Sequence, residues 1–201
     1  NGKTTYAMEG SIFIAGAGVQ WLRDRMKFFK KAPETEKIVK SLKSNNGIYL
    51  VPAFTGLGAP YWNANSRGVL SGITRDTNPK QIIRATIEAV AYQTYDLFEA
   101  MKHDGLRPRI VKVDGGMVMN SWFSQFLSDV VNVKVLRPKV QETTAAGAAF
   151  MAGLKVGVYK SLKDISKNWQ LDRQFSPKMK NSSRNYLIKG WLTAIKRTLI
   201  N

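Results

Sequence analysis

The stretch Arg-Ile-Val-Lys-Val-Asp-Gly-Gly-Met-Val-Met-Asn, residues 109–120, decides the fold class that we predict for this chain. Its residues Ile110, Val111 and Val113 form a short β-branched run, as expected for a strand that is covered on both faces. The two glycines after Asp114 have no Cβ atoms, so a ligand can approach the backbone where the strand ends. The same glycine pair is also typical of a plain tight turn, and the ligand hypothesis therefore needs support from other segments.

A helix and a second strand are predicted to follow. Apolar residues recur at helical spacing after Asn120 and leave that residue at the entrance of the helix. They are Trp122, Phe123, Phe126, Leu127 and Val130. Alternating valines then predict a strand from Val131 to Leu136. Strand, helix and strand in this order predict a parallel pair with a right-handed crossover, and such sheets bind ligands beyond the carboxyl ends of their strands.

Composition predicts a globular protein without disulfides and without cysteine- or histidine-built metal sites. At 201 residues and 44% hydrophobic content, the chain suits one large domain or two small ones. It has no cysteine, and its one histidine, His103, is too little for a histidine-built zinc site. His103 lies at an expected helix end, where a basic side chain suits the helix dipole. No apolar run reaches about eighteen residues and no signal-peptide layout is visible, so we expect a cytoplasmic protein without a membrane partner.

The net charge of +17 raises a nucleic-acid hypothesis, which the sequence supports poorly. Lysines and arginines are spread along the chain and are densest in residues 23–31 and 155–196, mostly between apolar residues of expected amphipathic helices. We find no zinc finger, no RNA-recognition aromatic signature and no glycine clamp for RNA. We interpret the charges as solvated helix faces, or as the counterpart of an acidic partner or domain, and do not expect nucleic acid as the main partner.

The first thirty residues predict a strand and a helix. Residues 4–8 have strand character with no polar leader, so the chain is expected to begin in mid-fold. A helix with one apolar stripe is predicted from Ser11 to Phe29, with Ser11 as a candidate cap.

Two glycines inside this predicted helix are unfavourable and need an explanation. Gly16 and Gly18 each cost roughly 1 kcal/mol relative to alanine, so we expect something to approach the backbone closely there. Tight packing and a ligand are equally good explanations. Gln20 lies one turn beyond Gly16 on the same side, and the pair is therefore a candidate polar edge for a nucleotide.

The middle of the chain predicts two strands and a long helix. The strands are expected at residues 48–51 and 68–73, and the glycine-bearing loop at residues 54–62 lacks the lysine and the spacing of a phosphate-binding P-loop. Asn78 and Pro79 form a strong helix start, and Gly105 a helix end after about Met101. Three polar residues of this helix are interpreted as solvated or packing-edge residues rather than catalytic ones, namely Glu88, Gln93 and Glu99.

Two helices are predicted in the last third. Thr143 and Thr144 are expected to cap a helix of very small residues, 145–153, which can lie unusually close to its neighbours. A final helix is marked by an apolar stripe of Ile188, Trp191, Leu192, Ile195 and Leu199.

Three separated segments resemble glycerol kinases, which belong to the FGGY carbohydrate kinases. Residues 6–24 closely resemble the segment that opens the second half of glycerol kinases, and this match is specific to them within the larger family. Residues 52–62 are similar to their glycine-rich loop, and residues 68–88 to a signature of the wider family. The stretch 114–116, Asp-Gly-Gly, together with Asn120, completes the set. The resemblance covers roughly residues 4–160.

The resemblance implies an α/β fold of the actin-like ATPase, ribonuclease H-like kind, with a mixed sheet and helices on both faces. It also implies that Gly16, Gln20, Gly116 and Asn120 bind the nucleotide, ATP or ADP. The residue types agree, because glycines allow backbone approach, and the amides of Gln20 and Asn120 can form hydrogen bonds without adding charge. Trp21 and Trp122 adjoin two of these residues in sequence, and we expect a bound adenosine to perturb their fluorescence.

The resemblance further implies that residues 1–201 form the C-terminal, nucleotide-binding domain of an enzyme whose N-terminal domain is absent from this chain. The catalytic aspartate, the glycerol-binding residues and the phosphate-contacting turns are expected in that first domain, so no catalytic or metal-binding residue is assigned here. Without them, this chain alone should be inactive. Asn63, where an aspartate is common in the family, affects local loop contacts only.

The complete enzyme is expected to convert ATP and glycerol to ADP and sn-glycerol 3-phosphate with Mg²⁺, as a homo-oligomer. Two alternatives stay open at this point. The chain can be half of another FGGY sugar or polyol kinase, because the specificity residues are not in it. It can also be a noncatalytic basic module that binds nucleic acid or another protein, a hypothesis that rests on the net charge.

Overall fold

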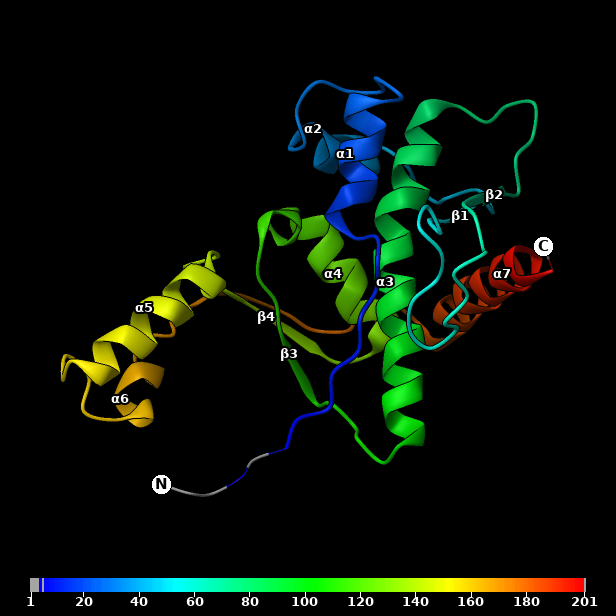
Figure 1. Ribbon diagram of the computed structural model, residues 1–201. Coiled ribbons are helices and arrows are strands. Elements are labelled where there is room, and N and C mark those ends of the chain that lie inside the picture. Colours follow the sequence, from blue (N-terminus) through cyan, green and yellow to red (C-terminus); the bar gives the residue numbers. More distant parts are fainter. Residues whose placement is uncertain (1–3, 5, 201) are drawn as a thin grey trace.

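The computed structural model describes residue 4 and residues 6–200 (Figure 1). The helices are α1 (Gly16–Asp24), α2 (Glu34–Lys40), α3 (Pro79–His103), α4 (Ser121–Val131), α5 (Thr143–Lys155), α6 (Leu162–Ser166), α7 (Asn181–Leu199) and the 3₁₀ turn η1 (Gly116–Met119). The strands are β1 (Tyr49–Val51), β2 (Val69–Ser71), β3 (Ile110–Lys112), β4 (Lys134–Pro138) and β5 (Leu171–Phe175). None of the described helices is long and apolar enough to cross a membrane.

The strands form a mixed three-stranded sheet and a separate antiparallel pair. β3 and β4 are parallel, as predicted from the order of strand, helix and strand, although β4 begins at Lys134 rather than at Val131, which still belongs to α4. β5 adds to β4 in the antiparallel direction. β1 and β2 form the second, two-stranded sheet. The sequence analysis missed β5, because four of its five residues are exposed and no apolar alternation marks it. Ile110 is 54% exposed, so β3 is not covered on both faces as predicted.

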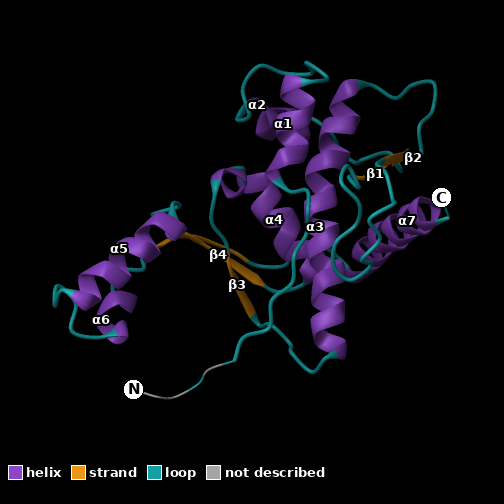
Figure 2. Ribbon diagram, viewed as in Figure 1, coloured by secondary structure: helices purple, strands orange, loops and turns teal. Residues whose placement is uncertain are grey.

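Helix α3 runs through the middle of the molecule, with α1 and α4 alongside it (Figures 1 and 2). Its start is the one predicted. The Asn78 side chain accepts a hydrogen bond from the Lys80 amide at 3.0 Å, while Gln81 accepts one from the Asn78 amide at 2.9 Å. This reciprocal capping box satisfies two of the free amides at the helix start. The helix is followed by Gly105 with a φ of +88°, also as predicted.

The interpretation of Glu88 and Gln93 as solvated or edge residues is wrong. Glu88 is fully buried and accepts hydrogen bonds from the side chains of Arg84 at 2.7 Å, Asn45 at 3.0 Å and Tyr92 at 3.2 Å. Gln93 is buried too, and donates to the Ile14 carbonyl at 3.1 Å. The middle of helix α3 is covered on nearly all sides, so its buried polar residues are paired with other protein groups instead of water.

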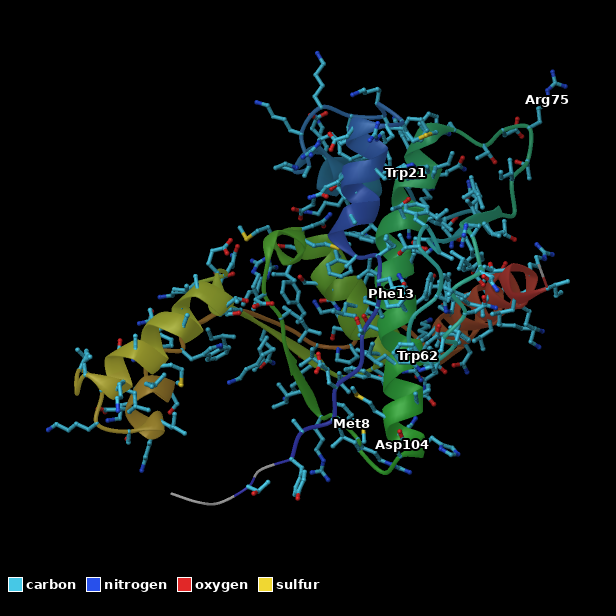
Figure 3. The ribbon with its side chains drawn as sticks, viewed as in Figure 1. Met8, Phe13, Trp21, Trp62, Arg75 and Asp104 are labelled. Atoms are coloured by element: carbon cyan, nitrogen blue, oxygen red, sulfur yellow. The ribbon has the colours of Figure 1, made fainter. Side chains whose placement is uncertain are left out.

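The N-terminal segment is less regular than predicted. Helix α1 begins at Gly16 rather than at Ser11, because Ser11 is tied to another segment: its carbonyl accepts a hydrogen bond from the Ala59 amide at 3.2 Å. The expected strand over residues 4–8 does not form at residue 4 or at residues 6–8, and residue 5 lies outside the described part of the chain. Met8 and Phe13 are exposed on this segment, which runs past α3 in Figure 3.

Helices α5 and α6 project from the body of the molecule (Figures 1 and 2). We predicted that the small residues of α5 bring it close to its neighbours, but none of its residues is buried. A Cβ atom added at Gly147 would meet no atom within 4 Å. Thr143 does not cap the helix, since its hydroxyl is directed to the Asp114 carboxylate.

A buried carboxylate joins α3 to α7 and to the loop at residues 54–62. Asp96 of α3 accepts a hydrogen bond from the Trp191 indole of α7 at 2.7 Å, and the Tyr61 hydroxyl lies near its carboxylate. Burial raises the pKa of Asp96 to about 6, although the Trp191 and Tyr61 donors act in the opposite direction. The folded protein therefore favours the neutral carboxyl group more than the unfolded chain does.

We predict that Asp96→Asn stabilises the protein at neutral pH relative to acidic pH. A carboxyl pKa of about 6 in the folded state, against 3.8 as the ordinary value, gives stability that is present below pH 4 and lost as the pH rises through 6. The variant lacks this loss but keeps an oxygen for Trp191. Its advantage over the wild type in the free energy of unfolding should grow by roughly 3 kcal/mol between pH 3.5 and pH 7.5. Urea titrations across this range measure it, and a constant difference would contradict the assignment.

Candidate functional site

A cavity of about 430 Å³ lies between α1, the start of α2 and the turn η1. Gly16, Gln20, Gly116 and Asn120, the four residues predicted to bind a nucleotide, all line it. They come from two segments about a hundred residues apart, and the fold brings them to one place. A larger groove of about 800 Å³ lies between residues 43–47, α4 and α7, and none of the four lines it.

The two glycines of α1 have different surroundings. A Cβ atom at Gly18 would lie 3.0 Å from the Thr86 methyl group, so this glycine lets α1 pack tightly on α3. A Cβ atom at Gly16 would meet nothing within 4 Å, because the residue faces the open cavity. Tight packing therefore explains the glycine at position 18, whereas access for a ligand remains the hypothesis for the glycine at position 16. Gln20 is exposed one turn further along the same wall.

The second wall is the turn between β3 and α4. Gly115 has a φ of +82°, a backbone conformation that favours glycine, and its amide donates to the Gln141 carbonyl at 3.2 Å. Gly116 has open space where a side chain would be. The chain does not enter α4 directly, as predicted, but first forms η1. Asn120 then caps α4, because its side-chain oxygen accepts a hydrogen bond from the Phe123 amide at 3.0 Å.

The third wall was missed in the sequence. It is formed by residues 32–36, to which the sequence analysis assigned no role. Ala32, Pro33, Thr35 and Glu36 line the cavity there. No motif marks these residues, because small and polar residues before a short helix are common in any connection.

The cavity is apolar inside and charged at its edge. Val19, Ile87, Met117 and Met119 supply apolar surface. The two charged residues of the lining are paired: Arg23 with Asp24 at 2.7 Å, and Glu36 with Lys40 at 2.6 Å. A flat apolar ligand with hydrogen-bonding edges, such as a nucleobase, suits this lining. Within the described residues, no group of three or more His, Asp or Glu side chains is placed to hold a metal ion.

The two tryptophans that adjoin the predicted residues in sequence do not line the cavity. Trp21 packs against the Phe54 ring at a centroid distance of 4.9 Å, on another side of α1 (Figure 3). Trp122 stacks on Phe126 at 5.0 Å and lies below the Arg84 guanidinium. The expectation that their fluorescence reports a bound adenosine therefore has no support in the structure, and binding is better measured by calorimetry.

The mixed sheet, the central buried helix and this cavity define an α/β ligand-binding domain of the actin-like ATPase class. Residues 1–156 match the family described as "FGGY family of carbohydrate kinases, C-terminal domain", and the chain belongs to this family. The resemblance and the fold class predicted from the sequence are confirmed.

The relatives specify the kind of kinase that the chain is similar to. It is 53% identical over 197 residues to glycerol kinase 1 of Pseudomonas aeruginosa and 54% identical over 198 residues to the glycerol kinase of Alcanivorax borkumensis. Each match covers 98% of this chain and 40% of the relative, so the chain spans about two fifths of these proteins.

Solved structures agree with this similarity. The crystal structure of Plasmodium falciparum glycerol kinase with ADP matches 94% of this chain and 38% of that one, with a TM-score of 0.84 and 35% identity. A xylulose kinase from Lactobacillus acidophilus matches 93% of this chain and 38% of its own, with a TM-score of 0.77 at 22% identity, and shows the shared fold alone.

We predict that alanine at the two glycines of α1 separates packing from the cavity. Gly18→Ala should lower the free energy of unfolding by about 1–3 kcal/mol, because the buried Thr86 methyl group has little room to move. Gly16→Ala should leave it unchanged or raise it by up to roughly 1 kcal/mol, because its Cβ atom enters open space and alanine favours a helix more than glycine does. Chemical denaturation of both variants measures the difference, and equal losses would contradict this assignment.

Proposed function

We propose that this chain is the nucleotide-binding C-terminal domain of a glycerol kinase. The complete enzyme would transfer the γ-phosphoryl group of ATP to glycerol and give ADP and sn-glycerol 3-phosphate. The observation that carries this proposal is the meeting of Gly16, Gln20, Gly116 and Asn120 around one cavity of nucleobase size. The identity of just over 50% to glycerol kinases supports the choice of substrate.

The cavity suggests how these residues would hold adenosine. Gly16 and Gly116 lack side chains on two of its walls, so a base can slide between them and contact backbone. Gln20 and Asn120 offer amide groups at the edge, where hydrogen bonds fix the orientation of the base. The uncharged amides leave the negative charge of the ligand to groups that contact its phosphates. Mg²⁺ bound to those phosphates would neutralise charge during transfer.

The remaining parts of the proposal concern the complete enzyme. We propose that the catalytic aspartate and the glycerol site belong to an N-terminal domain, that residues 1–201 by themselves do not phosphorylate glycerol, and that the enzyme is a cytoplasmic homo-oligomer. Phosphoryl transfer requires that both substrates are positioned together, and one wall of a cleft does not achieve this.

We predict that the 201-residue chain binds MgADP in isothermal titration calorimetry at physiological salt. The double variant Gln20→Ala, Asn120→Ser should weaken binding roughly tenfold or more, since two hydrogen bonds to the ligand are lost. Serine keeps a capping oxygen for α4, so the fold is retained. Asn168→Ser, on the exposed surface of the α6 region, is the matched control and should bind like the wild type. Equal affinities for all three proteins would contradict the assigned site.

We predict that the chain restores a complete kinase when it replaces the matching segment of Pseudomonas aeruginosa glycerol kinase 1. The chimera should phosphorylate glycerol with ATP and discriminate against xylulose and gluconate. Introducing Gln20→Ala and Asn120→Ser into the chimera should raise KM for ATP and leave KM for glycerol unchanged. A folded chimera that binds MgADP but does not phosphorylate glycerol would contradict the proposed reaction while leaving the nucleotide site intact.

A further inference from the structure

Thr35 lies where two walls of the cavity meet. It belongs to the first turn of α2 and is only 4% exposed, yet it lines the cavity. Its hydroxyl group donates a hydrogen bond to the Ala32 carbonyl at 2.7 Å. Ala32 and Pro33 form the neighbouring part of the same wall. The hydroxyl of Thr35 therefore fixes the backbone of the wall that the sequence did not reveal.

The same hydroxyl oxygen also meets the wall that carries Asn120. The side-chain nitrogen of Asn120 donates to the Thr35 oxygen at 3.5 Å, a long hydrogen bond between residues 85 positions apart. The side-chain oxygen of Asn120 accepts from the Phe123 amide at 3.0 Å. Both ends of the Asn120 amide thus have a protein partner, and its plane has one preferred orientation.

The two protein partners of the Asn120 amide determine which of its hydrogen-bonding positions remain free for a ligand. The nitrogen of Asn120 has a second hydrogen, and its oxygen has a second lone pair, so a nucleotide can use what Thr35 and Phe123 leave free. Without the hydroxyl of Thr35, the amide plane would be held from its oxygen side alone. Binding would then have to order the amide, which costs conformational entropy and lowers affinity.

We propose that Thr35 is a positioning residue for the nucleotide, which joins the two walls of the cavity and orients the amide of Asn120. This inference rests on the proposed nucleotide site and adds a residue that acts on the ligand through another side chain. A positioning role accounts for a buried hydroxyl group in this part of the lining, where an apolar side chain would fill the same space.

Two variants separate the hydroxyl from the shape of Thr35. Thr35→Ser keeps the hydroxyl, and Thr35→Val keeps the shape without it. We expect Thr35→Val to weaken MgADP binding about threefold, less than one ordinary hydrogen bond would give because the contact is long, while Thr35→Ser stays within about 1.5-fold of the wild type. Equal affinities for the wild type and Thr35→Val would overturn the proposal.

A double-mutant cycle shows whether Thr35 acts through Asn120. Asn120→Ser removes the amide and keeps a capping oxygen for α4. In this background Thr35→Val should change MgADP affinity by less than about twofold, because no amide remains to be oriented. A loss equal to that in the wild-type background would overturn the proposal and show that Thr35 contacts the ligand directly or acts only on Ala32.

One further measurement tests the contact between Thr35 and Asn120 without any nucleotide. The side-chain amide signals of Asn120 in the ligand-free protein should shift in the NMR spectrum of Thr35→Val and stay in place in Thr35→Ser. An absence of MgADP binding in the wild type would refute the proposed function and Thr35's role in it, while this shift would still report the contact. Unchanged Asn120 signals in Thr35→Val would overturn the positioning role whatever the nucleotide result.

Discussion

The structure depends on the burial of α3, and at its centre on one nearly buried ion pair between Arg84 and Glu88. Glu88 is fully buried, and Arg84 holds it at 2.7 Å while also donating to the Leu42 carbonyl at 2.6 Å. Removing one partner of such a pair leaves an uncompensated charge and typically costs about 3–5 kcal/mol. Burial raises the pKa of Glu88, and the guanidinium of Arg84 opposes this rise. The pair joins α3 to the segment that follows α2, so the helix that fills the core also fixes what surrounds it.

The shape of the cavity depends on the position of α3. Helix α1 lies against α3 through Gly18, and Ile87 of α3 contributes to the cavity lining between the other walls. Two parts of the lining thus lie on the helices α1 and α3, which pack against each other, and a wall fixed in this way orients a ligand with a smaller loss of entropy. The pairing of Arg23 with Asp24, which raises the pKa of the guanidinium, leaves little net charge at the edge. Affinity for the base would then come from shape and neutral hydrogen bonds.

The sequence predicted those parts of the fold that depend on local patterns. The parallel unit around residues 109–120, the capping box at Asn78 and the approach of Gly16 to Gln20 follow from β-branched runs, cap residues and helical spacing. What it did not predict depends on tertiary contacts. The charge of Glu88 suggested solvent, and only the fold shows that its partners are two residues of the same helix and Asn45 from the segment after α2. Strand β5 carries no apolar alternation, because it pairs at the edge of a sheet with mostly exposed residues. The wall at residues 32–36 has no motif, and only spatial proximity makes it part of the cavity.

Asn120 is both a helix cap and a cavity residue, and this double role leaves a trace in evolution. In a lineage that no longer used the cavity, selection for stability alone would still retain a capping side chain at this position, so serine, threonine and aspartate would replace asparagine freely. Gln20 is exposed and contributes no such cap, so its position would drift without restriction. Among homologues, asparagine kept at position 120 together with glutamine at position 20 would therefore indicate continued use of the cavity, whereas a capping residue at 120 with a random residue at 20 would indicate its loss.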